Sequence, residues 1–334
     1  FEREFVSMVE EFGLELAGEG VKSIESAWAL LDEMYTDAGL DIPLSRFTGH
    51  AGFITFDQII KELKSDLLTK QCGIEQEPIL IAEDQPFIND IPQEYEGLYK
   101  MVPHKEILEI LETKREEYIA MSSHQAGVMN SALFCEEMLA FMLDKYKDRF
   151  SIYEHSPVNK IILHEDSALL DVESNILTAN RVVLCTNGFE NLTIINDFGL
   201  EVNAKYHHNV EGMIGYMSGY LETMNKPPMA NVFLEEDTQN FEDPYFYVTR
   251  RQYEYEKDAK HNLISIGGPE VRIGEEVPYS YEDDYPEDKA EEIDKFVKQT
   301  YDLDQNRKID YVFTWHGLMG YTKNGIRMVG PEPA

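Results

Sequence analysis

Apolar residues recur along this chain with two periods, and these periods separate predicted helices from predicted strands. Residues 24–38 carry apolar side chains every three to four positions and are followed by Gly39, which predicts a helix that ends there. The same spacing predicts helices in further ranges. They are residues 58–68, 105–121, 131–146 and 286–301, and the broadest apolar stripe lies in 131–146.

Alternating or β-branched apolar residues predict strands, which gather in the second half of the chain. The strand candidates are residues 45–56, 151–162, 167–177, 210–221, 229–234, 245–251, 262–268 and 308–315. The charged loop 254–261 separates residues 245–251 from residues 262–268, so we expect these two strands to pair as a hairpin. Residues 76–103 are acidic and contain several prolines, which predicts an ordered loop region.

Residues 181–185 end in the apolar run Val-Val-Leu-Cys and stop abruptly at Thr186, Asn187 and Gly188. A run that is apolar at every position is typical of a strand buried on both faces, as in a parallel sheet between helices. The small polar bend that follows it allows the backbone to approach a ligand closely. The bend is therefore a candidate binding site, and a plain turn is its structural alternative.

Charge narrows the range of partners. The 334 residues include 29 Lys and Arg against 63 Asp and Glu, a net charge of −34. Such a surface repels phosphate backbones and anionic lipids, so nucleic acid and membrane surfaces are disfavoured as partners. No apolar run is long enough to span a bilayer, and we expect a cytoplasmic protein of undetermined oligomeric state.

Cysteine and histidine positions indicate neither a disulfide framework nor a metal site. The three cysteines are far apart in sequence, and the apolar surroundings of Cys135 and Cys185 predict packed thiols. His207 and His208 are neighbours on one predicted strand, where adjacent side chains diverge, and no third ligand lies at a usable spacing. The order of elements predicts an α/β fold of two interleaved domains.

Several segments, in the expected order, resemble the FAD-dependent oxidoreductases of the D-amino-acid oxidase, glycine oxidase and sarcosine oxidase type. The segments are residues 124–134, 152–158, 182–189, 262–269 and 315–330. The resemblance implies an α+β substrate domain with an antiparallel sheet, interleaved with part of a Rossmann-like FAD-binding domain. The implied division is a helical and loop part at 1–120, a partial FAD-binding domain at 121–200, a β-rich substrate domain at 201–315 and a return to the FAD-binding domain at 316–334.

The resemblance also implies cofactor contacts. Val158 would lie along the adenosine end of FAD, and Thr186, Asn187 and Gly188 would line the cofactor. The loop from Gly317 to Gly330, which includes Gly325, would pass near the isoalloxazine ring.

Catalytic and substrate-binding candidates come from the same comparison and from side-chain chemistry. The catalytic candidates are His316, Tyr321 and Arg327, and the substrate-binding candidates are Tyr247, Arg250 and Arg251. An arginine can hold a carboxylate with two parallel hydrogen bonds. Since adjacent strand residues point to opposite faces, at most one arginine of the pair 250–251 faces a pocket. Ion pairing is the alternative for each arginine, and a structural role is the alternative for His316.

The sequence also departs from the family pattern. It contains no GxGxxG, and Met319 stands where relatives place a carboxylate-binding Arg or a flavin-linked Cys. Asn324 and Arg327 replace the usual Asp and Pro. The resemblance thus predicts a fragment that lacks its dinucleotide-binding start and its last flavin-binding segment.

The predicted function belongs to the parent enzyme: oxidation of an amine or amino-acid-like substrate at a C–N bond by FAD. We expect the fragment to be inactive alone, and the FAD expected for the parent is not necessarily bound by this chain. Two alternatives stay open, a non-catalytic substrate or interaction domain without bound flavin, and an FAD-dependent hydroxy-acid dehydrogenase.

Overall fold

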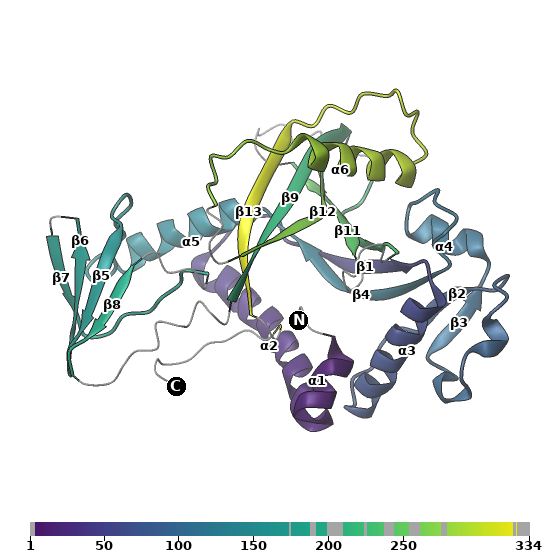
Figure 1. The fold of residues 1–334 in the computed structure, drawn as a ribbon, viewed down its shortest axis with the longest axis horizontal. Coiled ribbons are helices and arrows are strands. Elements are labelled where there is room, and N and C mark those ends of the chain that lie inside the picture. Colours follow the sequence, from purple (N-terminus) through teal and green to yellow (C-terminus); the bar gives the residue numbers. More distant parts are fainter. Residues whose placement is uncertain are drawn as a thin grey trace.

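The computed structural model of the chain describes residues 4–173, 175–187, 192–198, 210–223, 226–236, 244–253, 261–274, 279–322 and 325. Two sheets and a set of surrounding helices make up this part of the chain (Figure 1). The helices are α1 (Phe5–Phe12), α2 (Leu14–Ala38), α3 (Phe56–Gln71), α4 (His104–Ile110), α5 (Ser131–Lys145) and α6 (Glu287–Thr300), with short 3₁₀ turns η1 (Ile88–Asp90) and η2 (Gln93–Tyr95). The mixed α/β class agrees with the prediction.

The larger sheet has nine strands in the order β13-β9-β12-β11-β10-β1-β4-β2-β3. Its strands are β1 (Ser45–Phe53), β2 (Ile79–Ala82), β3 (Tyr99–Val102), β4 (Ala120–Val128), β9 (Val210–Thr223), β10 (Met229–Leu234), β11 (Tyr245–Gln252), β12 (His261–Ile273) and β13 (Phe313–Thr322). The part from β9 to β13 is antiparallel, and β11 and β12 pair as the predicted hairpin. The parallel pairs β1–β10 and β2–β3 make the whole sheet mixed rather than antiparallel.

Helices cover both faces of this sheet. On one face, Phe296 of α6 stacks on Phe246 of β11 with ring centroids 4.1 Å apart. On the other face, Ile59 and Leu63 of α3 pack with Phe53 of β1. We call the first of these the α6 face. Because the sheet takes strands from residues 45–128 and from residues 210–322, its core joins distant parts of the sequence.

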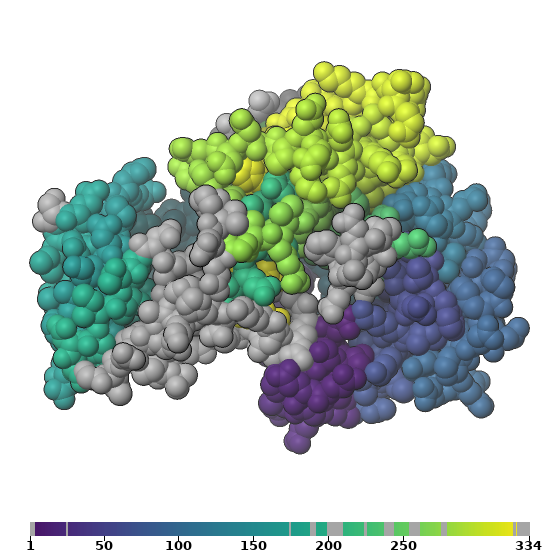
Figure 2. All heavy atoms as spheres, viewed as in Figure 1, coloured from purple at the N-terminus to yellow at the C-terminus, as the bar shows by residue number. Residues whose placement is uncertain are grey.

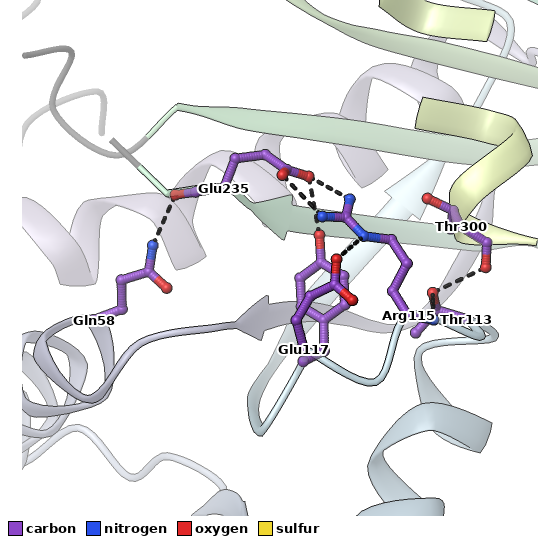
Figure 3. Close-up of polar contacts among 7 residues, drawn as sticks. Gln58, Thr113, Arg115, Glu117, Glu235 and Thr300 are labelled. Carbon is purple, nitrogen blue, oxygen red and sulfur yellow. Dashed lines mark hydrogen bonds and ion pairs between the residues drawn. The ribbon is translucent and has the colours of Figure 1, made fainter. Parts of the chain in front are cut away.

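Polar contacts connect four elements at the edge of the α6 face (Figure 3). Arg115, in the loop before β4, makes a two-pronged ion pair with Glu235 just after β10, and its Nε donates to Glu117. Gln58 of α3 donates to the Glu235 carbonyl at 3.0 Å. Thr113 donates to the carbonyl of Thr300, the last residue of α6, at 3.0 Å. These contacts therefore connect the loop before β4 with the ends of β10 and α6, and the start of α3 with the end of β10.

The smaller sheet forms a lobe of its own at one end of the molecule (Figure 2). Its strands are β5 (Val158–Leu163), β6 (Ala168–Val172), β7 (Asn175–Ala179) and β8 (Thr193–Asn196), in the order β7-β6-β5-β8. Ile176 and Leu177 are neighbours on β7, so they point to opposite faces, and both are exposed. Within the described residues, neither face of this sheet is covered along β7.

The strand predicted at residues 181–185 is wrong. These residues form no strand, and Val183 is 83% exposed. A strand buried on both faces needs neighbouring strands and covering helices, and no strand among the described residues pairs with this run. Cys185 and Cys135 are also exposed instead of packed.

Two helix predictions need correction. The helix predicted over 105–121 ends at Ile110, because Glu112 adopts a left-handed backbone with φ 54° and the chain then enters β4. The helix predicted over 131–146 is present as α5, but none of its residues is buried. Its apolar stripe therefore makes no core in the described part of the chain.

Candidate functional site

Glycine, methionine and aromatic residues line the face of β9–β13 opposite to α6. Residues directly opposite each other in antiparallel strands share a face, and this register builds two short rows across the strands. We call the surface of these rows the platform. It consists of Tyr247 on β11, Gly267 on β12, Met217 and Gly215 on β9, and Trp315 and Gly317 on β13.

The glycines of the platform differ in what lies over them. A Cβ on Gly267 would lie 2.4 Å from the Tyr247 hydroxyl oxygen, so the tyrosine ring occupies the space over this glycine. A Cβ on Gly317 would meet no atom within 4 Å, so the surface is open there. The Tyr247 hydroxyl donates to Met217 Sδ at 3.2 Å. Burial, with a smaller effect of Glu270, raises the pKa of Tyr247, so its phenol stays protonated at neutral pH.

The predicted polar bend contacts the edge of β13 that pairs with no strand in the described part of the chain. Asn187 has a left-handed backbone with φ 57°. Its Nδ2 donates to the Leu318 carbonyl at 3.1 Å, and the Gly320 backbone N–H donates to its Oδ1 at 3.2 Å. A Cβ at position 320 would lie 2.0 Å from the Asn187 carbonyl oxygen, so this approach requires glycine. Thr186 precedes the contact, whereas Gly188 lies outside the described residues.

Arg250 and Arg251 lie on opposite faces, as the alternation predicts. Arg250 is buried on the α6 face, and its Nη1 and Nη2 donate to Glu112 at 3.0 and 2.6 Å. Burial alone would raise the pKa of Glu112, but hydrogen bonds from Arg250 and Lys226 hold it at about 2. Arg251 shares the face of Tyr247 and donates to the Gln252 carbonyl at 3.0 Å. Arg250 is thus committed to an ion pair away from the platform.

His316 also points to the α6 face, since it lies opposite Tyr216 and between two residues of the other face. Its Nε2 lies 2.9 Å from the Asp283 carbonyl, which can only accept, so this nitrogen carries the proton. Nδ1 is then free to accept from the Tyr279 hydroxyl at 3.2 Å. Both ring nitrogens therefore have partners within the protein.

The remaining candidates are dispersed. Tyr321 lies on the platform face of β13, with its hydroxyl 3.9 Å from Met319 Sδ. Gly325 has φ 67° and its N–H donates to the Thr322 carbonyl. Val158 begins β5 in the smaller sheet. Arg327, Asn324, His207 and His208 lie outside the described residues.

Sequence reasoning missed most of the platform. Met217, Gly215, Gly267 and Trp315 were not among its candidates. The available signal was the repeated glycine in residues 212–219, which is unusual within one long strand. Among the residues that the structure covers, no group of three or more His, Cys, Asp or Glu could hold a metal ion. No helix in the same part of the chain is long and apolar enough to cross a membrane.

Solved structures with a similar fold include three oxidoreductases. Glycine oxidase from Geobacillus kaustophilus matches with a TM-score of 0.57 and 14% identity, over 96% of this chain and 71% of that chain. L-proline dehydrogenase from P. horikoshii matches with a TM-score of 0.55 and 12% identity, over 97% and 69%. Glycine oxidase from Bacillus cereus matches with a TM-score of 0.52 and 13% identity, over 93% and 69%.

The chain therefore shares the fold of glycine oxidase and L-proline dehydrogenase, and this agrees with the fold that the sequence resemblance predicted. No protein-family model matches the sequence, and a search of curated proteins finds no significant match.

Proposed function

We propose that this chain forms the substrate-binding part, and a share of the cofactor-binding part, of an FAD-dependent oxidoreductase. The proposed reaction is oxidation of an amine or amino-acid-like substrate at a C–N bond. Its fold is similar to that of glycine oxidase and L-proline dehydrogenase, two proteins named for the oxidation of an amino acid. The observation that carries the proposal is the contact of Asn187 with β13 beside the platform. It joins two segments that the sequence resemblance assigned to one cofactor site.

The residues present fit a flat cofactor ring at the platform. Gly317 leaves the strand surface open, and Met217, Trp315 and Tyr247 supply apolar and aromatic surface around it. We assign Gly317, Gly325, Thr186 and Asn187 to the cofactor side. Val158 and Gly188 remain proposed contacts of its remote end. When bound, FAD supplies the electron acceptor that the oxidation requires.

The chain's own side chains would orient the substrate and exclude water. Tyr247 stays protonated because burial raises its pKa, so it serves as a hydrogen-bond donor rather than as a base. Tyr321 and Arg251 share the platform face and remain proposed substrate contacts. For His316, whose ring nitrogens contact Tyr279 and Asp283, we propose that it positions β13. Arg327 remains a proposed catalytic residue.

A non-catalytic interaction domain is the second candidate function. The specific observation in its favour is the exposure of residues 181–185, a run whose composition suits a buried strand. A domain of this kind would use the platform to bind a ligand or protein without holding flavin.

An FAD-dependent hydroxy-acid dehydrogenase is the remaining alternative for the parent enzyme. Flavin bleaching under anaerobic conditions with amines and with hydroxy acids separates these two oxidations.

Reconstitution with FAD tests the proposed function. The purified chain is incubated with excess FAD, desalted and examined for the flavin absorption bands. Gly317→Leu and Gly274→Leu form a matched pair, because a Cβ at either position meets no atom within 4 Å. We expect the wild type and Gly274→Leu to retain FAD, and Gly317→Leu to lose it by obstruction of the platform. A colourless wild-type protein, or equal retention by both variants, would contradict the cofactor site.

A further inference from the structure

A β-bulge changes the direction of one acidic side chain in β12. Gly267 lies opposite Met217, and the next pair on this strand joins Glu270 to Gly215. One residue separates the two partners on β9, whereas two residues, Gly268 and Pro269, separate them on β12. The extra residue shifts the alternation, so Glu270 lies on the same face as Gly267. Without the bulge it would point to the α6 face.

The bulge therefore places a carboxylate at the margin of the platform. Glu270, Gly215 and Gly317 form one row across three strands, and Gly317 is the open position of that row. Glu270 is also close enough to Tyr247 for its negative charge to act on that phenol. A negative group, an aromatic ring and an open surface thus adjoin each other.

The neighbouring row provides apolar surface. Met319 lies opposite Met213, and the Met319 methyl would be 2.8 Å from a Cβ on Gly215. Arg272, opposite Met213, is exposed and pairs with Glu211 at 3.3 Å. Arg272 is thus paired with a carboxylate of β9, and Glu270 adds a negative charge beside the apolar side chains of Met213 and Met319.

We propose that Glu270 binds the ammonium group of a cationic amine substrate beside the Tyr247 ring, with Met319 contacting the apolar portion of the substrate. A carboxylate accepts short, charge-assisted hydrogen bonds from an ammonium group, and a tyrosine ring attracts the same charge. This inference rests on the proposed function for its chemical meaning, but the binding step needs no flavin. The substrate would then be an amine whose recognition needs no carboxylate-binding residue at position 319.

Titration calorimetry with n-butylammonium, butyrate and 1-butanol tests the inference. The three compounds share an alkyl chain and differ in charge. We expect the wild type to bind n-butylammonium in preference to the other two, and Glu270→Gln to bind it about tenfold more weakly or worse. Glu287→Gln, at an exposed position at the start of α6, removes the same charge elsewhere and should bind as the wild type does.

Two results would overturn the inference. One is n-butylammonium binding that is weakened equally in Glu270→Gln and Glu287→Gln, which would indicate attraction by the overall charge of −34. The other is binding of butyrate to the wild type as tight as that of n-butylammonium. Absence of n-butylammonium binding to the wild type would have the same meaning. Circular dichroism and thermal unfolding must show that Glu270→Gln is folded, and Glu270→Asp should retain part of the affinity.

Separate measurement of FAD binding distinguishes the two proposals. Glu270-dependent n-butylammonium binding by a chain that holds no FAD supports this inference while the proposed function fails. If the chain retains FAD but binds n-butylammonium equally well with and without the Glu270 carboxylate, the proposed function is supported and this inference fails.

Discussion

Asp66 shows how burial changes the acid–base behaviour of a single residue. It lies on α3 one turn after Glu62, and its side chain is buried. Burial, and secondarily the charge of Glu62, raises the pKa of Asp66 from 3.8 to about 7. Burial also raises the pKa of Glu62, against an opposing hydrogen bond from Ser122. Two carboxyl groups therefore share a region that disfavours charge.

The stability of the protein should depend on Asp66 between pH 4 and pH 7. In this window the folded state keeps a proton that the unfolded state releases, so stability falls as pH rises and levels off above about 7. Asp66→Asn removes this loss. We expect the free energy of unfolding of Asp66→Asn, relative to that of the wild type, to increase between pH 4 and pH 8 by up to about 4 kcal/mol.

Urea unfolding at several pH values measures this difference. Asp41→Asn, at an exposed position in a loop, is the control for the change of charge. If the free energy of unfolding changes between pH 4 and pH 8 by the same amount in the wild type and in Asp66→Asn, the assigned role of Asp66 is contradicted.

At the scale of elements, the contact of Asn187 with β13 is the feature that the proposed function depends on most. The amide of this one side chain makes both a donor and an acceptor contact with the strand edge, as a neighbouring strand would. Asn187→Ala removes both hydrogen bonds. We expect the peptide that covers β13 to exchange its amide hydrogens about fivefold to thirtyfold faster, since each of the two bonds contributes about 1 kcal/mol.

Hydrogen exchange followed by mass spectrometry checks this expectation. Asn175→Ala on β7, an exposed asparagine in the smaller sheet, provides the comparison. If β13 exchanges at the same rate in both variants, the bend does not hold the strand edge. The proposed cofactor site would then lose its main structural support.

Element prediction was most successful where the pattern is local. The start of α3 is set within four residues, because Thr55 and Gln58 form a reciprocal capping box. The hairpin of β11 and β12 also followed from alternation on both sides of one loop. In contrast, the helical pattern of residues 105–121 continued past Ile110, where the left-handed Glu112 and its ion pair with Arg250 turn the chain toward β4. That partner is more than one hundred positions away.

The candidate site was likewise predictable where it depends on neighbouring residues and not where it depends on residues distant in sequence. The sequence placed the bend at Thr186 and Asn187 and the long glycine-containing stretch from Gly317 in one site, and the structure brings Asn187 to Gly320. Most of the platform was missed, because it is a set of single residues from four strands. Alternation separated Arg250 from Arg251 but could not determine which arginine faces the platform.

At the scale of the whole molecule, the two sheets differ in how well they are covered. The larger sheet packs against α3 and α6, whereas only Ile161 and Ala168 are buried among the described residues of the smaller sheet. We expect the smaller sheet to unfold first. Its amides should lose protection at a lower urea concentration than those of β9 to β12, because less apolar area opposes its unfolding.

Hydrogen exchange at increasing urea concentrations tests this separation. Val248→Ala in the large core should lower the unfolding midpoint of β9 to β12, by a cavity cost of about 1–3 kcal/mol. Val183→Ala, at an exposed position, should change neither sheet by more than about 0.5 kcal/mol. One cooperative transition for both sheets would show that they are energetically joined.

Sequence patterns alone predicted the fold class, most helices and strands, the net negative charge and the resemblance to FAD-dependent oxidoreductases. These follow from periodicity, composition and order, which are carried by neighbouring residues. Tertiary structure alone decided the order of strands, the shift of Glu270 by the bulge, the face of each arginine and the exposure of residues 181–185. The physical reason is that a side chain's face and burial depend on strand register and on covering layers, which distant segments supply.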